Sequence, residues 1–134
     1  MSSKGEKKIE RILSTNGFSY KKEVSFNNLR GFKQPLRFDF AVYRNNKFLF
    51  LLEVDGQQHF EYIPYFHKTK AGFRKEIIMD EKKNSFCLLN KIPLIRIPYW
   101  ALEELTIRDI LTNKDFIVKS KHHYSYFNNG GGNK

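Results

Sequence analysis

Residues 36–55 read LRFDFAVYRNNKFLFLLEVD, and they give the clearest indication of the fold. Its two halves, residues 36–43 and 47–55, are rich in the aromatic and aliphatic side chains that favour strands. Only Arg44-Asn45-Asn46 separates them, which is short enough for a hairpin turn. The sequence therefore predicts an antiparallel β-hairpin near the middle of the chain.

Side chains alternate along a strand, so each hairpin strand is expected to carry its acidic residues on one face. The first strand is expected to place Arg37, Asp39 and Ala41 on one side and Leu36, Phe38, Phe40 and Val42 on the other. The second is expected to place Glu53 and Asp55 on the side of Leu49 and Leu51.

Either register of the hairpin brings carboxylates close together. A three-residue turn makes Glu53 the diagonal neighbour of Asp39, roughly 7 Å away, and a shift of one residue pairs the two directly. On such an apolar strand pair, carboxylates repel one another unless they share a cation. The sequence thus predicts a Mg²⁺ or Mn²⁺ site with Asp39, Glu53 and Asp55 as ligands. The alternative is that acids at strand ends are simply hydrated.

A glycine loop follows the acidic strand end, and its histidine, His59, is a candidate for proton transfer beside the metal. A helix over residues 69–89 is expected to place one acid in a mainly apolar stripe made of Phe73, Ile77, Asp80, Asn84, Cys87 and Leu88. An inward-facing Asp80 needs a partner, and the His59 loop would supply one. The alternative is a surface acid that pairs with Lys83 or Asn84.

The rest of the chain alternates helix and strand signals. Ser3-Lys4-Gly5-Glu6 is typical of a capping box, and Arg96 is expected to face away from Ile95 and Ile97 in a short buried strand. The further expected elements are a helix over 4–16, a strand over 20–26, loops over 27–35 and 62–68, a strand over 92–98 and a helix over 101–111. Residues 1–112 are predicted to form the core domain and residues 113–134 a basic, flexible C-terminal tail that includes His122 and His123.

The charge of the chain points to a polyanionic partner. Its 24 Lys and Arg against 14 Asp and Glu give a formal net charge of +10 and a pI of about 9.7. Because the lysines are scattered along the chain, we expect DNA rather than a membrane surface. Without a signal-peptide core, the protein is expected inside the cell, in the cytoplasm or nucleoid of its host, and not secreted. The single cysteine, Cys87, excludes an internal disulfide and a zinc finger.

Several spaced motifs follow the pattern of a known enzyme family. They are Ser3-Lys4-Gly5-Glu6, Phe38-Asp39-Phe40, Glu53-Val54-Asp55-Gly56-Gln57-Gln58-His59, Asp80 with Lys83-Asn84, and Ile95-Arg96-Ile97-Pro98-Tyr99. Over roughly residues 2–111, these motifs make the chain resemble the EDxHD nucleases. That family contains relatives of the very-short-patch repair endonuclease and is often found as homing endonucleases in phages and large DNA viruses.

The resemblance implies a single-domain α/β fold with a restriction-endonuclease-like core, related to the PD-(D/E)XK fold, in which helices flank a mixed β-sheet. It also implies a Mg²⁺-dependent endonuclease that hydrolyses phosphodiester bonds in DNA. By motif, the four catalytic positions would be Glu6, Asp39, His59 and Asp80. Asp55 stands where a Glu-x-Lys nuclease has its lysine, so His59 would take over the orientation of the attacking water.

Basic and amide side chains of the helices and loops are expected to contact DNA phosphates, and the set is Arg37, Gln58, Lys70, Arg74, Lys75, Lys82 and Lys83. A homodimer remains open. So do three other functions: a Holliday-junction or flap resolvase, a non-catalytic DNA-binding module, and an RNA-directed nuclease in which Tyr62, Tyr65 and Phe66 stack on bases.

Overall fold

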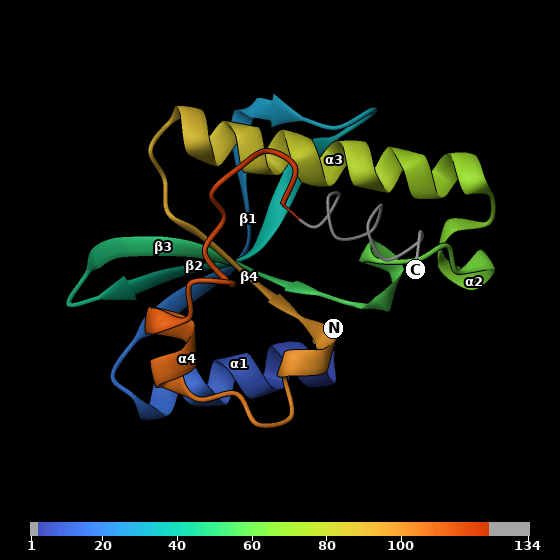
Figure 1. Cartoon of the computed structure of the whole chain (residues 1–134). Helices are drawn as coiled ribbons and strands as arrows, with labels where there is room; N and C mark the ends of the chain where they lie inside the picture. The colour runs from blue at the N-terminus through green and yellow to red at the C-terminus, as the bar shows by residue number, and fades with distance from the viewer. Residues whose placement is uncertain (1–2, 124–134) are drawn as a thin grey trace.

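The computed structural model describes residues 3–123 and has a four-stranded mixed sheet flanked by helices (Figure 1). The strand order is β1-β2-β3-β4, with β1, β2 and β3 antiparallel and β4 parallel to β3. The strands are β1 (Ser19–Arg30), β2 (Pro35–Arg44), β3 (Lys47–Asp55) and β4 (Leu94–Pro98). The helices are α1 (Lys4–Thr15), α2 (Pro64–His67), α3 (Lys70–Leu89) and α4 (Ile107–Thr112), with short 3-10 turns η1 (Gln57–His59) and η2 (Tyr99–Ala101). The predicted α/β class is confirmed.

Two apolar cores lie on the two faces of the sheet. Helix α3 crosses one face, and α1 and α4 lie against the other (Figure 1). The α1 side is built from residues such as Ile9, Leu13, Phe40, Leu52 and Ile97. The α3 side is built from residues such as Phe38, Ala41, Leu51, Cys87 and Leu94. Both faces of β3 and β4 are therefore buried, which explains their nearly continuous apolar sequence.

The hairpin of β2 and β3 forms as predicted, but with a tighter turn. Arg44 pairs with Lys47, so the turn has two residues, and both Asn45 (φ 52°) and Asn46 (φ 64°) have positive φ. This is the backbone that a type I′ turn requires and that asparagine tolerates. A register shift follows at once, because Tyr43 pairs with Phe48 and Val42 with Phe50.

That shift leaves Leu49 as an extra residue on β3, a β-bulge, and it changes which side chains share a face. Leu49 packs against the α1-side core, whereas Leu51 is buried on the α3 side, so the prediction that they share a face is wrong. Beyond the bulge, Phe40 pairs with Leu52. The next residues, further from the turn, are Asp39 on β2 and Glu53 on β3. This is the second of the two predicted registers, in which Asp39 pairs directly with Glu53.

The expected alternation along β2 is also wrong at one point. Phe40 packs edge-on against Tyr20 on the α1 side, whereas Phe38 lies beneath the Lys83 ammonium on the α3 side, 5.5 Å from it. On β1 the facing residue, Glu23, has φ 53°, between the pairs Lys22–Phe40 and Val24–Phe38. The change of face along β2 thus coincides with an irregular backbone at the facing position of β1.

Several boundaries differ from the sequence-based expectations. Residues 27–30, expected in a loop, continue β1, and residues 62–68 contain the short helix α2. The helix expected over 101–111 is divided between η2 and α4, because a capping box of Thr106 and Asp109 starts a new helix. On α3, Asp80, Asn84 and Cys87 are buried as expected, but Leu88 is exposed.

The core continues past residue 112, where the sequence suggested a tail. Phe116 and Val118 are buried, the Arg96 N–H donates to the Phe116 carbonyl (2.8 Å), and the Val118 N–H donates to the Leu94 carbonyl (3.0 Å). Apolar residues spaced by two thus add this segment to the edge of β4. The remainder of the expected tail, residues 124–134, lies outside the described residues. Within residues 3–123, no helix has the length and apolar character needed to cross a bilayer.

Candidate active site at the carboxyl ends of β3 and β4

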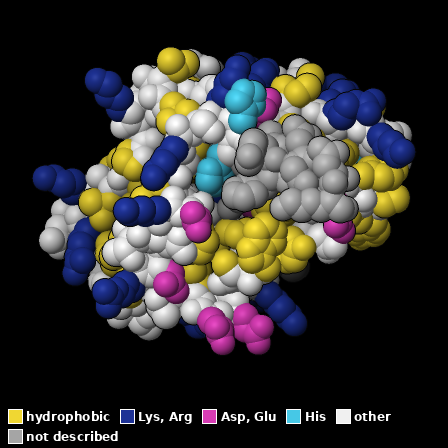
Figure 2. All heavy atoms as spheres, in the orientation of Figure 1, with side chains coloured by type: hydrophobic (Ala, Val, Ile, Leu, Met, Phe, Trp, Pro, Cys, Tyr) yellow, Lys and Arg dark blue, Asp and Glu magenta, His cyan; other side chains and the backbone are white. Residues whose placement is uncertain are grey.

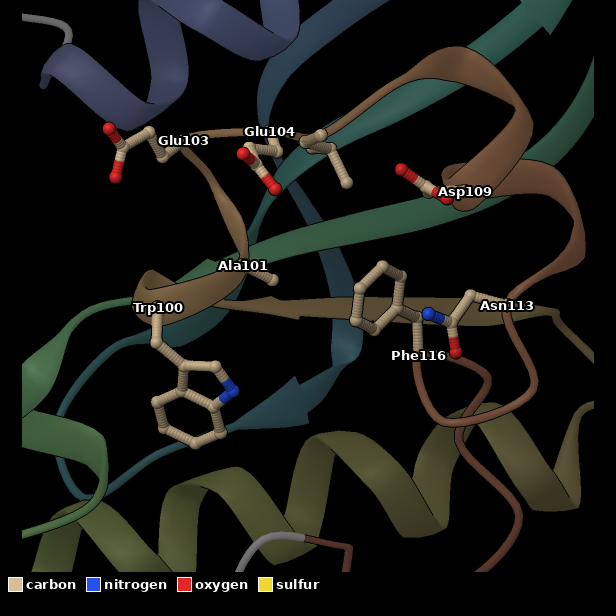
Figure 3. A pocket seen from close by; sticks show the side chains of 8 residues that line it. Trp100, Ala101, Glu103, Glu104, Asp109, Asn113 and Phe116 are labelled. Carbon is tan, nitrogen blue, oxygen red and sulfur yellow. The ribbon is translucent and has the colours of Figure 1, made fainter.

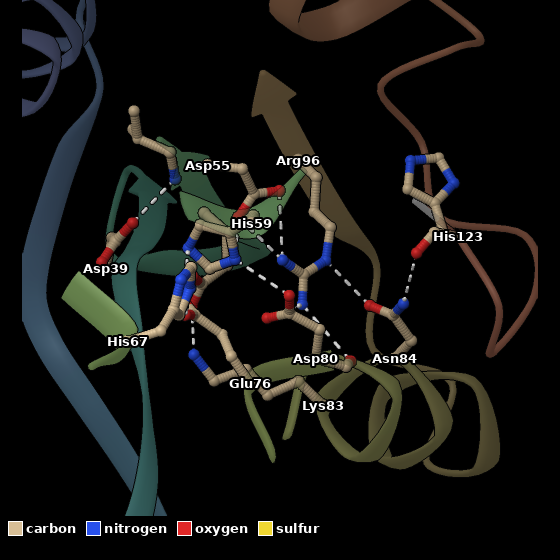
Figure 4. A network of polar contacts seen from close by, with 12 residues as sticks. Asp39, Asp55, His59, His67, Glu76, Asp80, Lys83, Asn84, Arg96 and His123 are labelled. Carbon is tan, nitrogen blue, oxygen red and sulfur yellow. Dashed lines mark hydrogen bonds and ion pairs between the residues drawn. The ribbon is translucent and has the colours of Figure 1, made fainter. Parts of the chain in front are cut away.

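The predicted site residues converge where the parallel strands β3 and β4 end. Glu53 pairs in register with Arg96, and Asp55 with Pro98, so acidic and basic side chains of neighbouring strands face α3 together. Turn η1 starts two residues after Asp55 and places His59 above the strand ends, opposite Asp80 of α3 (Figure 4). The crossover connection between parallel strands brings these elements to one edge of the sheet.

Asp39 and Glu53 form the first part of the site. One Asp39 carboxylate oxygen accepts a hydrogen bond from the Val54 N–H (2.7 Å), at the point where β2 and β3 separate (Figure 4). Burial and the negative charge of Glu53 raise the pKa of Asp39 to about 8, against the opposing effects of this hydrogen bond and of Lys83. Burial also raises the pKa of Glu53. The two carboxylates therefore repel one another in a poorly hydrated place.

Lys83, predicted to contact DNA, lies beside this pair. Its ammonium is 3.1 Å from a Glu53 carboxylate oxygen, and its side chain is only 14% exposed. Although burial acts to lower it, the charge of Glu53 raises the pKa of Lys83, so the ammonium is retained. A lysine supplied by α3 thus lies next to the acid of β3, which the spacing along β3 alone did not indicate.

Asp55, expected as a metal ligand, is instead held by Arg96. Both Asp55 carboxylate oxygens accept from the guanidinium, at 2.9 and 3.1 Å, and both side chains are fully buried. The Arg96 Nε–H donates to the Asn84 side-chain oxygen (2.8 Å). Both oxygens accept from the same nitrogen, Nη1, in a buried charge-assisted pair. Asp55 thus supports the site together with Arg96, and its role as a metal ligand stays a prediction.

His59 is surrounded by carboxylates. Its Nδ1 lies 2.9 Å from an Asp80 oxygen and 3.7 Å from Asp55, and its Nε2 lies 3.5 Å from Glu76 (Figure 4). Burial acts to lower the pKa of His59, but these three acids raise it to about 9. The charges of Arg96 and His59 in turn lower the pKa of Asp80, despite its burial. The predicted pairing of His59 with Asp80 is confirmed, and the imidazole carries a proton at neutral pH.

Glu76 and His67 extend this chain of contacts, and the sequence analysis missed both. The second Glu76 oxygen lies 2.8 Å from His67 Nε2, while His67 Nδ1 accepts from the Ile63 N–H (2.9 Å). Because Nδ1 accepts, His67 must carry its proton on Nε2 and donate it to Glu76. Glu76 precedes Asp80 by four residues and so shares its helix face, which is the signal that could have identified it.

Glu6 comes close to the first part of the site from the start of α1. The Ser3 hydroxyl accepts from the Glu6 N–H (3.1 Å), which caps the helix, and the Glu6 carboxylate lies 3.5 Å from the Lys22 ammonium. Its charge is among those that raise the pKa of Asp39. Glu6 thus belongs to the surroundings of Asp39 but keeps a cationic partner of its own.

The acids of this site suit a hydrated Mg²⁺ or Mn²⁺ better than a fully protein-coordinated ion. Within residues 3–123, no three His, Cys, Asp or Glu side chains are arranged to hold a metal together. Asp39 and Glu53 nevertheless present two mutually repelling carboxylates, and Mg²⁺ commonly binds one or two carboxylates while it keeps several waters. Asp39 and Glu53 are therefore the residues that would hold such an ion.

Of the residues that were predicted to contact DNA, other than Lys83, all the cationic ones are exposed, whereas the one amide, Gln58, folds back over the loop. Figure 2 shows Lys and Arg side chains spread over the surface. The exposed ones of the predicted set are Arg37, Lys70, Arg74, Lys75 and Lys82. The Gln58 amide folds over Gly56, where an added Cβ would lie 2.5 Å from its Oε1.

A separate hollow lies among η2, the loop after it and α4 (Figure 3). It has a volume of about 360 Å³ and is lined by Trp100 and Phe116 together with Glu103, Glu104 and Asp109. Asp109 is already engaged in the cap of α4. The hollow contains none of the predicted site residues.

Comparison with known proteins gives no information on the activity of this chain. No family model matches the chain, and no solved structure matches it. A stretch of 61 residues is 41% identical to Uncharacterized protein 307L of Invertebrate iridescent virus 6. That stretch makes up 46% of this chain and 28% of the viral protein, so the likeness concerns a part of each. The name of the viral protein states no activity.

Proposed function

We propose that this chain is a metal-dependent DNA endonuclease with a restriction-endonuclease-like core, similar to very-short-patch repair and homing endonucleases. The observation that carries the proposal is the pair of opposed carboxylates, Asp39 and Glu53, with the Lys83 ammonium 3.1 Å from Glu53. The Lys83 ammonium offsets part of this negative charge but leaves the pKa of Asp39 raised to about 8, and clustered groups with shifted pKa values mark functional sites. The protonated His59 at the same end of the sheet supplies an acid.

Asp39 and Glu53 would hold Mg²⁺ or Mn²⁺ in this proposal. When bound, the ion would polarise the scissile phosphate and help to ionise the attacking water. Val54 fixes the orientation of Asp39 through its N–H, and Lys83 fixes that of Glu53. The Lys83 ammonium is also placed to attract a phosphate oxygen, since it retains its charge while it is buried.

His59 would donate a proton to the departing oxygen of the cleaved strand. Asp80 and Asp55 contact the imidazole through Nδ1, and Glu76 lies 3.5 Å from Nε2, the nitrogen that would release the proton. The neighbouring carboxylates raise the pKa of His59 to about 9, which favours this acid role over the base role that the sequence analysis kept open. Arg96 supports both acids from below, with its guanidinium 2.9 Å from Asp55 and 3.6 Å from Asp80.

The exposed cations would bind DNA phosphates without reading bases, which fits the net charge of +10. Such binding should weaken steeply with salt. We also propose that the protein acts inside the cell that contains its DNA substrate. A homodimer, in which two sites cut the two strands, is the assembly to test by sedimentation.

The experiment is cleavage of supercoiled plasmid with Mg²⁺, Mn²⁺ or EDTA, by wild type and by the variants Asp39→Asn and His59→Gln. We expect metal-dependent nicking, lost in EDTA and reduced at least about a hundredfold in both variants. Asp109→Asn, in the acidic hollow, is the control and should cut like wild type. A folded wild-type protein that cuts neither plasmid nor a branched DNA substrate would refute the proposal.

A further inference from the structure

The tip of the β1–β2 hairpin carries an exposed aromatic ring between two lysines. Phe32 is 54% exposed, and the ammonium groups of Lys75 and Lys82 lie 5.2 and 5.7 Å from its ring centroid. The loop is fixed by a hydrogen bond from the Gly31 N–H to the Gln34 carbonyl (2.7 Å). The Lys82 ammonium also lies 3.4 Å from the Arg30 carbonyl, so α3 holds the tip in place.

Further exposed cations lie on the same hairpin. They are Arg30, Lys33 and Arg37, and Lys75 and Lys82 lie about two helical turns apart on α3. Phe32 is therefore an apolar surface within a group of five positive charges. Although two ammonium groups contact this ring, 54% of Phe32 stays exposed, and a nucleotide offers both a flat base for the ring and phosphates for the lysines.

The location relates this tip to the proposed active site. Pro35 begins β2 opposite Arg30, and Asp39 follows four residues later, about 13 Å along an extended strand. Lys82 adjoins Lys83, whose ammonium lies beside Glu53. One nucleic-acid strand could contact the hairpin tip and the carboxylates at the same time.

We infer that Phe32 is a stacking platform for an unpaired base of the DNA substrate, with Lys75 and Lys82 bound to the phosphates on either side of that nucleotide. The inference deepens the proposed function, on which it rests, because it makes the substrate a DNA with a single-stranded or unstacked segment. A regular duplex keeps its bases stacked on one another and presents only phosphates to this surface. Stacking on an aromatic side chain requires an accessible base face.

The test is DNA binding in EDTA, without cleavage, to a fluorescein-labelled oligothymidine and to a duplex of the same length. Phe32→Leu should raise the Kd for oligothymidine about tenfold, since stacking of one base contributes about 1–3 kcal/mol, and the Kd for the duplex less than about twofold. Phe32→Trp should restore single-strand binding. Phe48→Leu, which changes an exposed aromatic residue at the other end of the hairpin strands, is the matched control and should leave both affinities unchanged.

Substitution of the two lysines should affect DNA binding differently from substitution of Phe32. Lys75→Gln combined with Lys82→Gln should weaken binding of both DNAs and lower the slope of log Kd against log salt by about 2, because two phosphate contacts are lost. Equal effects of Phe32→Leu on single strand and duplex would overturn the inference, as would tighter binding of oligouridine than of oligothymidine. Because no metal is present, loss of cleavage in the plasmid experiment leaves this binding result intact, and the two proposals fail separately.

Discussion

His59 shows at the scale of one residue how the site sets a protonation state. Three carboxylates face the ring, from β3 and α3, and raise its pKa from 6.5 to about 9, although burial acts in the opposite direction. A histidine whose folded-state pKa is raised stabilises the fold fully below its unfolded pKa, and this stabilisation is lost as pH rises through the folded value. His59 therefore favours the folded state most below pH 6.5 and ceases to do so above about pH 9.

The same residue determines the expected pH dependence of cleavage. If His59 is the acid, the rate of nicking at saturating Mg²⁺ should fall as pH rises through about 9. Glu76→Gln removes one of the charges that raise this pKa, so the alkaline fall should move to lower pH while the fold is kept. The measurement is the pH profile of the nicking rate for both proteins. An unchanged alkaline limb in Glu76→Gln would contradict the assigned role of Glu76.

The β2–β3 hairpin shows at the scale of an element what the sequence could predict. Its existence, its antiparallel sense and the closeness of Asp39 and Glu53 followed from apolar periodicity and a short polar connection. The faces of Leu49 and Phe38 did not, because they depend on a bulge and on the positive φ of Glu23. Such irregularities arise from packing between strands and leave no fixed residue pattern.

The turn of this hairpin gives a prediction of stability. Asn46 has φ 64°, which glycine adopts freely and a β-branched residue adopts only with strain. Asn46→Val should lower the free energy of unfolding by at least about 1 kcal/mol, and Asn46→Gly should leave it equal or slightly higher. Urea denaturation of the two variants checks this. Equal stabilities would show that the turn does not fix the register.

At the scale of the whole molecule, one buried ion network joins β3, β4 and α3. Arg96 donates to Asp55 and Asn84 and lies 3.6 Å from Asp80. The sequence indicated that Asp80 faces inward and that Arg96 faces away from Ile95 and Ile97, but it could not show that the two side chains meet, since their elements come together only in three dimensions. Glu76 and His67 were missed, and the contact of Lys83 with Glu53 was not predicted, because these contacts depend on how α2 and α3 pack over the strand ends.

This network should be essential for folding. Arg96→Met removes one charge and leaves the buried Asp55 without its partner, so it should destabilise the protein by about 3–5 kcal/mol. Arg108→Met, on the exposed side of α4, is the control and should change stability by less than about 0.5 kcal/mol. Urea denaturation at pH 7 measures both. A small loss in Arg96→Met would mean that the buried acids are neutral.

In the proposed site, Asp39 and Glu53 repel one another until they share a divalent cation, and thermal denaturation at pH 8 measures both the repulsion and its relief. In EDTA, Asp39→Asn should be more stable than wild type, because the raised pKa of Asp39 records the cost of its charge in the folded state. Added Mn²⁺ should then raise the Tm of wild type by several degrees and leave that of Asp39→Asn nearly unchanged. Equal Tm changes of the two proteins in Mn²⁺, with Asp39→Asn less stable than wild type in EDTA, would show that Asp39 and Glu53 do not bind the cation together.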